Sequence, residues 1–251
     1  MLNHEKLETY INNFYGFGNW NSDFWFIGME EGGGNKESEV QKRLDSWHSS
    51  STDLIDNKTH HQRIGITKFF DRGILQSTWA KLIRLKLSIK GELSGNDNTD
   101  RKKIRNVQKH SWGQLKSDNA LLDLFPLPSP GIGKWRYKTE QWTDIDYLQS
   151  REKYRDTLKE MRTQYIREKI NSHQPKVVVF YSATYIPYWN EIIQGDFKNE
   201  KQANTFVQNK NTMRWLIKNG TCFVQMPQPS AARANSFWND AGTEIRKHLW
   251  P

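Results

Sequence analysis

The sequence contains one cysteine, Cys222, among its 251 residues. A single cysteine excludes a disulfide within the chain, a four-cysteine zinc site and a four-cysteine iron–sulfur cluster. The adjacent histidines His60 and His61 lie in a polar stretch without a carboxylate or third ligand at the spacing of a metal site, so we interpret them as part of a solvated loop. We therefore expect neither a metal ion nor a cofactor.

Long hydrophobic runs are also absent. The longest, Val177–Tyr181 and Phe24–Ile27, are far shorter than the ~18 residues that a membrane span needs. The mean hydropathy of −0.87 is strongly hydrophilic. The first residues, Met-Leu-Asn-His-Glu-Lys, are charged where a secretory signal would be apolar. The sequence predicts a soluble, cytoplasmic protein with no membrane partner.

Aromatic side chains and positive charge, by contrast, are plentiful. The 11 Trp, 12 Phe and 9 Tyr residues are enough to bury a real core, which excludes disorder of the whole chain. The 37 Lys and Arg residues outnumber the 28 Asp and Glu residues, and the net charge is +9. This surplus fits a solubility device as well as an electrostatic footprint for a polyanion, so charge alone does not identify a partner.

Short apolar runs bounded by turn residues recur along the chain. They are continuous rather than alternating, which is typical of strands buried on both faces of a parallel sheet. The runs are Asp23–Ile27, Leu121–Phe125, Val177–Tyr181 and Cys222–Gln225. Helical patterns lie between them, at Leu75–Leu87, Ser150–Ile170, Ala183–Ile193 and Asn235–Leu249. This order predicts an α/β fold: a single-domain, three-layer α/β/α arrangement of residues 1–251 with a central, mainly parallel four-stranded sheet.

A polar insertion covers about residues 35–71. We expect a poorly defined helix around Glu37–Ser50, followed by a long loop rich in Ser, Thr, Asn and His. The role of this insertion does not follow from the sequence.

The first strand leads into an unusual glycine-rich segment, Gly28-Met29-Glu30-Glu31-Gly32-Gly33-Gly34. Ligands of open parallel sheets bind just beyond the carboxyl ends of the strands. The glycines allow close approach of a ligand to the backbone, and the two carboxylates can supply a base or a water-positioning group. The spacing fits neither a dinucleotide-binding fingerprint nor a P-loop. A flexible turn with two solvated glutamates is the simpler alternative.

Two further strand ends contain polar residues that could bind a ligand. The strand Leu121–Phe125 contains Asp123, and a buried carboxylate costs several kcal/mol unless it is paired or hydrogen-bonded. Its partner is a nearby arginine or backbone amide, or a ligand amine. The last strand continues into Gln228-Pro229-Ser230, where prolines fix the loop and Ser230 can meet a phosphate near a helix start. A plain strand–helix turn would have the same sequence.

These strand ends together resemble the motifs of the uracil-DNA glycosylase superfamily, in order and in context. The segment Ile27–Gly32 resembles its first motif, Gly-x-[Asp/Asn/Ala]-Pro-[Gly/Tyr] after a hydrophobic strand, with Glu30 at the catalytic position and Glu31 in place of the proline. Leu121-Leu122-Asp123 resembles the base-reading Leu-Leu-Asn, and Gln228-Pro229-Ser230 resembles His-Pro-Ser with Gln for His. Residues 177–183 resemble the third core strand. The resemblance covers about residues 20–250.

The resemblance implies a hydrolase, a monofunctional DNA N-glycosylase that flips a base out of the helix and leaves an abasic site. A carboxylate would stabilise an oxocarbenium-like sugar and orient a water, and Glu30 is favoured over Glu31 for this role. Gln228 could donate a hydrogen bond to the leaving base but could not deliver a charge. The expected substrate-binding residues are Gly28, Met29, Asp123 and Phe125.

Asp123 stands where the family has an asparagine, and this departure bears on the substrate. An ionised aspartate only accepts hydrogen bonds, which suits the exocyclic amine of cytosine better than uracil. Ordinary cytosine must be spared, so an additional group at C5 would mark the target. The chain therefore also resembles anti-phage glycosylases of this superfamily that excise glucosylated hydroxymethylcytosine. Repair of uracil or of a damaged base is the conservative alternative.

Several residues are candidates for contacts with DNA, either double-stranded with a flipped base or single-stranded. Arg233 would fill the space of the flipped nucleotide, and Ser230 would contact a phosphate. A basic segment would neutralise further phosphates, although a solvated helix face explains it equally well. Its residues are Arg101, Lys102, Lys103 and Arg105. The aromatic residues considered for stacking on the base are Phe125, Phe70 and Trp47. We expect a monomer.

Two other classes of function compete with this interpretation. One is a non-catalytic nucleic-acid-binding protein of the same fold, although retention of a carboxylate at position 30 argues against it. The other is a hydrolase or nucleotidase of a different α/β type, in which Glu30 and Glu31 would share a magnesium ion.

Overall fold

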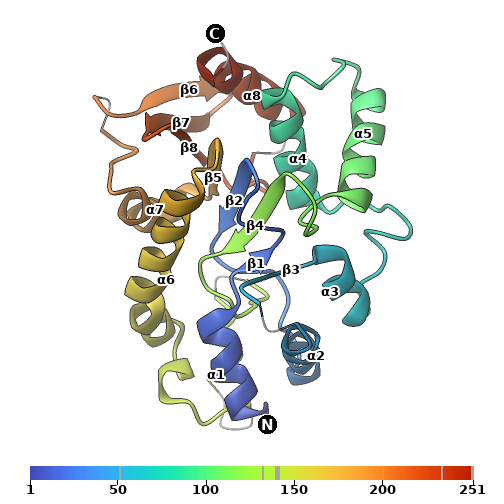
Figure 1. The fold of residues 1–251 in the computed structure, drawn as a ribbon, viewed down its shortest axis with the longest axis vertical. Helices are drawn as coiled ribbons and strands as arrows, with labels where there is room; N and C mark the ends of the chain where they lie inside the picture. The colour runs from blue at the N-terminus through green and yellow to red at the C-terminus, as the bar shows by residue number, and fades with distance from the viewer. Residues whose placement is uncertain (51, 132, 139–141, 200, 233, 250–251) are drawn as a thin grey trace.

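The central strands of the sheet are parallel and run side by side. The computed structural model describes residues 1–251 apart from 51, 132, 139–141, 200, 233, 250 and 251. The central strands are β2 (Phe24–Gly28), β4 (Asn119–Asp123), β5 (Val177–Tyr181) and β8 (Thr221–Met226), in the spatial order β4-β2-β5-β8 (Figure 1). All residues of β2, β4 and β8 are buried, which is why these runs are continuously apolar. They occupy the positions of the four predicted strands.

The sheet is nevertheless larger than predicted and is mixed. Within the described residues it has eight strands, in the order β3-β1-β4-β2-β5-β8-β7-β6. At one side, β1 (Gly16–Phe17) is antiparallel to β4 and parallel to β3 (Leu54–Ile55). At the other side, β7 (Asn211–Lys218) is antiparallel to both β8 and β6 (Asn204–Gln208). The four predicted strands are parallel to one another as expected, but the expectation of a four-stranded sheet is wrong in strand number, and the added strands make the sheet mixed.

The missed strands are short or only partly buried. β1 and β3 each contain two residues, too few to produce a pattern. In β6 and β7 polar and apolar residues are mixed, because β6 is an edge strand with exposed positions. The turn between them places Asn209 and Lys210 at φ values of 48° and 67°, the left-handed conformation that a tight hairpin turn requires.

Helices cover both faces of the sheet, with α6 and α7 on one face and α4 and α5 on the other (Figure 1). The helices are α1 (His4–Asn13), α2 (Glu37–His48), α3 (Asn57–Arg63), α4 (Ser77–Ile89), α5 (Asp97–His110), α6 (Arg151–His173), α7 (Ile186–Ile193) and α8 (Asn235–Leu249). Ser150 caps α6, because its side chain accepts a hydrogen bond from the Lys153 amide. The four predicted helices correspond to α4, α6, α7 and α8.

The insertion at residues 35–71 is structured. The expected helix is α2, but the expected long loop contains β3 and α3. The Asp56 side chain accepts a hydrogen bond from the amide of Thr59 and so caps α3. His60 and His61 are buried on this helix, with exposed fractions of 1% and 3%. The interpretation of these histidines as solvated loop residues is therefore wrong.

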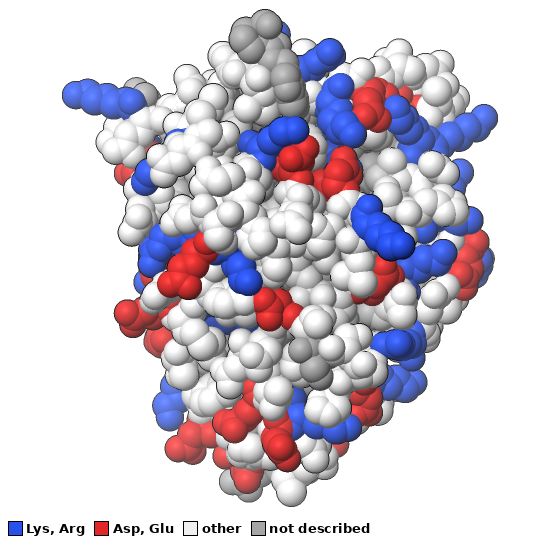
Figure 2. Space-filling model, viewed as in Figure 1, with Lys and Arg blue, Asp and Glu red and all other residues white. Residues whose placement is uncertain are grey.

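Charges of both signs are interspersed over the face shown in Figure 2. Basic side chains are frequent towards the edge near α5, and acidic ones are more frequent near α1. Within the part of the chain that the structure describes, no helix has the length and apolar character needed to cross a membrane.

Candidate active site at the carboxyl ends of the central strands

A cavity of about 420 Å³ lies where β2 and β4 end. We call it the inner cavity. Its lining comes from the strand ends (Glu30, Glu31, Gly32, Leu121, Leu122, Asp123, Tyr181 and Gln228), from β1 (Phe17), from the insertion (Arg43, His61, Ile66 and Phe69) and from the start of α4 (Gln76, Thr78 and Trp79). The three strand ends singled out in the sequence therefore meet at one place. The insertion forms one wall of the cavity.

The backbone around the cavity is fixed by pairing beyond the ends of β2 and β4. The Leu124 amide donates to the Gly28 carbonyl at 2.8 Å, and the Phe125 amide donates to the Met29 carbonyl at 2.7 Å. Further along, the Ser129 amide donates to the Glu31 carbonyl at 2.9 Å. Both carboxylate-bearing segments thus leave the sheet in register with each other.

Gly28 makes room for Tyr181, which comes from β5. A Cβ atom at position 28 would lie 2.2 Å from the Tyr181 hydroxyl oxygen and 2.4 Å from its ring carbon. Only glycine fits beneath this ring. Gly28 therefore shapes the floor of the site, although the residue itself is not part of the cavity lining.

Glu31 is held by an arginine and a histidine from the insertion. Its carboxylate lies 3.6 Å from Arg43 Nε and 3.4 Å from His61 Nε2. Burial alone would raise the pKa of Glu31, but Arg43 and His61 outweigh it and lower that pKa to about 2. Glu31 is therefore ionised at neutral pH.

His61 is oriented by a second contact. Its Nδ1 lies 2.9 Å from the main-chain oxygen of Asn57, which can only accept, so Nδ1 carries the hydrogen. A hydrogen bond from Nε2 to Glu31 then forms only when the ring is protonated. Burial lowers the pKa of the neighbouring His60 to about 3 and keeps that side chain neutral.

Glu30 is paired with two arginines from α6. Its carboxylate lies 3.1 Å from Arg151 Nη1 and 3.7 Å from Arg155 Nη2. Burial raises the pKa of Glu30, and the two arginines only partly offset this effect. The adjacent carboxyl groups of Glu30 and Glu31 thus have pKa values displaced in opposite directions by their surroundings.

Asp123 has no comparable partner. Among the described residues no group hydrogen-bonds its carboxyl group, and the nearby Arg162 donates instead to main-chain oxygens, including that of Asp123 at 2.8 Å. Burial raises the pKa of Asp123 well above its usual value, and the negative charge of Glu31 adds to the rise. The surroundings therefore shift Asp123 from the acceptor-only carboxylate assumed from the sequence towards the neutral acid, which has one donor and one acceptor.

The aromatic wall differs from the expected one. Phe17, Phe69, Trp79 and Tyr181 line the cavity. The three aromatic residues expected to stack on the base, Phe125, Phe70 and Trp47, are instead buried in the core and do not line the cavity. Phe125 packs against Tyr154 and Tyr188. Met29 is likewise buried outside the lining.

Sequence reasoning missed Arg43 and His61 because both belong to the insertion, which matched no motif. A weak signal was present, since Asp56 followed by Thr59 is an N-cap pattern that places His60 and His61 on a helix.

The expected DNA-contact residues have mixed surroundings. Arg101 and Lys102 are exposed on α5. Lys103 pairs with Glu92 at 3.0 Å, and Arg105 donates to the Gly73 carbonyl at 2.9 Å, so both hold neighbouring loops. Ser230 is exposed in the turn after β8. Arg233 lies outside the described residues.

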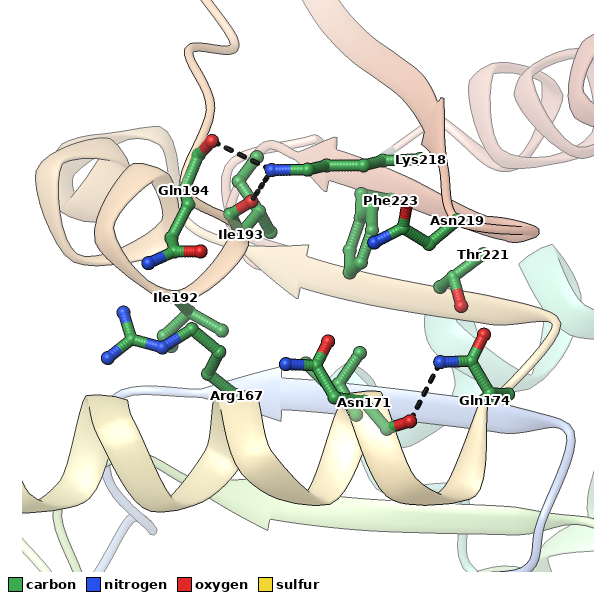
Figure 3. Close-up of a pocket in the computed structure, with 11 residues that line it drawn as sticks. Arg167, Asn171, Gln174, Ile192, Ile193, Gln194, Lys218, Asn219, Thr221 and Phe223 are labelled. Atoms are coloured by element: carbon green, nitrogen blue, oxygen red, sulfur yellow. Dashed lines mark hydrogen bonds between the residues drawn. The ribbon is translucent and has the colours of Figure 1, made fainter.

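A second hollow, of about 90 Å³, lies at the opposite end of the sheet, between α6, α7 and the start of β8 (Figure 3). Lys218 points across it and donates to the main-chain oxygens of Ile193 and Gln194 at 3.0 and 2.9 Å (Figure 3). Arg167 Nη1 donates to the main-chain oxygen of Glu191 at 3.1 Å. These cations satisfy the carbonyls at the end of α7, so we interpret this hollow as structural.

No protein-family model matches the sequence, and a search of curated proteins found no match.

Proposed function

We propose that the protein is a cytoplasmic, monomeric DNA glycosylase that hydrolyses the N-glycosidic bond of a flipped, modified base. One observation carries the proposal: Glu30, Glu31, Asp123 and Gln228, from three separate strand ends, line a single cavity at the carboxyl edge of the parallel strands. The resemblance of these segments to glycosylase motifs supports the same function. The volume of the cavity, about 420 Å³, is within the usual range for a small-molecule site.

The two glutamates divide the work of catalysis. When the bond between C1′ and the base nitrogen breaks, its electron pair leaves with the base and the sugar becomes positively charged. The ionised Glu31 stabilises that positive charge. Glu30, whose pKa is raised, orients the attacking water and takes its proton as the oxygen bonds to C1′. The Gln228 amide donates to the departing base.

Asp123 reads the base edge. As a neutral acid it can donate to N3 and accept from the N4 amine of cytosine. The same group can donate to O4 and accept from N3–H of uracil. The preference for cytosine that follows from an ionised aspartate therefore does not follow from the structure, and a 5-substituent must select the target base.

The surroundings of the carboxylates weaken the magnesium alternative. Glu30 is paired with Arg151 and Arg155, and Glu31 with Arg43 and His61, so each negative charge already has cationic partners.

An abasic-site assay tests the proposal. Wild-type protein is incubated, in chelator, with phage DNA containing glucosylated hydroxymethylcytosine, with uracil-containing DNA and with unmodified DNA, and abasic sites are revealed by strand cleavage at high pH. We expect abasic sites in modified DNA and none in unmodified DNA. Glu30→Gln should lower the rate by about 10²–10⁴-fold with the melting temperature retained. Absence of abasic sites on every substrate would overturn the proposal, and activity only with added magnesium would favour the alternative hydrolase.

A further inference from the structure

A second chamber adjoins the inner cavity. It has a volume of about 440 Å³ and shares Gly32, Arg43, Ile66 and Phe69 with the inner cavity. We call it the outer chamber. The rest of its wall includes Gly33, Glu39, Thr67, Lys68 and Arg72. Nearly all of it is built by the insertion and the glycines that precede it.

Gly32 leaves the junction of the two chambers open. A Cβ atom at this position would meet no other atom within 4 Å, and the residue is not in the left-handed backbone region. Gly32 lines both spaces, and its backbone would accept a side chain without strain. A larger residue would protrude into the junction.

The lining of the outer chamber contains both donors and acceptors. The donors are the side chains of Lys68 and Arg72, and the Lys68 ammonium lies 5.1 Å from the centre of the Phe69 ring. Glu39 accepts from the amides of Gly34 and Asn35 at 3.0 and 3.1 Å, and its side chain remains 30% exposed. Thr67 adds a hydroxyl, and Phe69 adds an aromatic ring. A hydroxyl group both donates and accepts, so a polyol matches this mixture of donors and acceptors, and the second test below separates it from a phosphate.

The two spaces are of similar size, about 420 and 440 Å³, and both lie in the usual range for a small-molecule site. A base in the inner cavity therefore leaves the whole outer chamber for a group attached to that base.

We propose that the outer chamber is a subsite for a hydroxylated substituent, of hexose size, attached to the base that occupies the inner cavity. The inference rests on the proposed function, and it assigns the selection of the modified base to residues of the insertion. An unsubstituted base would leave the chamber filled with water and lose these contacts. Ordinary bases are thus spared although Asp123 can read them.

Closing the junction is the first test. Gly32→Leu places a side chain between the chambers, and rates of base release are compared on DNA with glucosylated and with unglucosylated hydroxymethylcytosine. We expect the ratio of the two rates to fall at least tenfold relative to wild type. Melting curves and Gly32→Ala, which adds only one methyl group, serve as controls. An unchanged ratio in folded Gly32→Leu would overturn the inference.

Removing the cations is the second test, and it separates a sugar from a phosphate. Lys68→Ala/Arg72→Ala should raise the KM for glucosylated DNA at least tenfold more than for unglucosylated DNA. A phosphate contact would weaken both DNAs equally and reduce the salt dependence of binding. The matched control is Lys198→Ala/Lys201→Ala, which removes two exposed charges from the segment after α7.

The outcomes distinguish failure of the proposed function from failure of the proposed subsite. Failure of wild-type protein to release any base overturns the proposed function. Release by wild type, with equal effects of the variants on both DNAs, overturns the subsite and leaves the glycosylase assignment intact.

Discussion

Single side chains set the charge pattern of the site. Glu30, Glu31 and Asp123 lie on one cavity, yet their surroundings favour different protonation states: burial raises the pKa of Glu30 and Asp123, whereas Arg43 and His61 lower that of Glu31 to about 2. Their acid–base roles depend on these neighbours rather than on residue type.

The lowered pKa of Glu31 predicts a pH-dependent contribution to stability. A shift from 4.5 to about 2, at about 1.4 kcal/mol per unit, corresponds to about 3 kcal/mol. Because the folded-state pKa is the lower one, this contribution is present above pH ~4.5 and is lost as the pH falls towards 2. Glu31→Gln should therefore destabilise the protein by about 3 kcal/mol at pH 7 and by much less at pH 2.5. Urea unfolding at both pH values measures the difference, and a pH-independent effect would contradict the ion-pair role.

The raised pKa of Asp123 predicts the opposite trend. Its neutral form is favoured in the folded state, so its contribution is present at low pH and is lost as the pH rises through the folded-state pKa. Asp123→Asn, which is always neutral, should stabilise the protein relative to wild type at pH 8 and have little effect at pH 3.5. The same variant should keep its base preference, since an amide also offers a donor and an acceptor. Selective loss of activity on cytosine-type DNA would show that the ionised form reads the base.

At the scale of elements, the register between strands positions the site. Gly28 of β2 pairs with Asp123 of β4, so the segments after both strands emerge together. Arg162 of α6 ties these ends to α1, because it donates to the carbonyl oxygens of Ile11 and Phe14 as well as those of Asp123 and Leu124. The site is thus supported by regular structure on the sheet side, whereas the insertion closes the other side.

The close approach of Tyr181 to Gly28 can be tested by a double-mutant cycle. Gly28→Ala should destabilise the protein by about 1–3 kcal/mol, because the added methyl group overlaps the Tyr181 ring. In the Tyr181→Ala background the same substitution should cost much less, so the two effects are not additive. Thermal or urea unfolding of the four proteins measures this coupling. Additive effects would show that the ring simply moves aside.

At the scale of the whole molecule, the net charge of +9 does not identify a partner, and the face in Figure 2 carries both signs. Two of the basic residues on α5, Lys103 and Arg105, are engaged in contacts with loops. The remaining pair, Arg101 and Lys102, is exposed and available for phosphates.

Salt dependence tests whether that pair contacts DNA. The logarithm of the affinity should fall linearly with the logarithm of the salt concentration. Arg101→Ala/Lys102→Ala should reduce the slope by about 1.8, at roughly 0.9 per phosphate contact. Fluorescence anisotropy with a labelled duplex measures the slopes. An unchanged slope would assign these two residues to solvent only.

The sequence by itself determined the central strands and four of the helices. A strand buried on both faces requires a continuous apolar run, and a helix buried on one face requires apolar residues at helical spacing, so both patterns are visible in the local sequence. It also placed Glu30, Glu31, Asp123 and Gln228 at strand ends, where topology brings them together. Tertiary structure alone decided the rest. The strands β1, β3, β6 and β7 gain their pairing partners only in the folded chain, and His61 and Arg43 reach Glu31 from a segment that has no motif. Protonation was likewise decided by the fold, since whether a carboxyl group is charged depends on how deeply it is buried and which cations lie beside it.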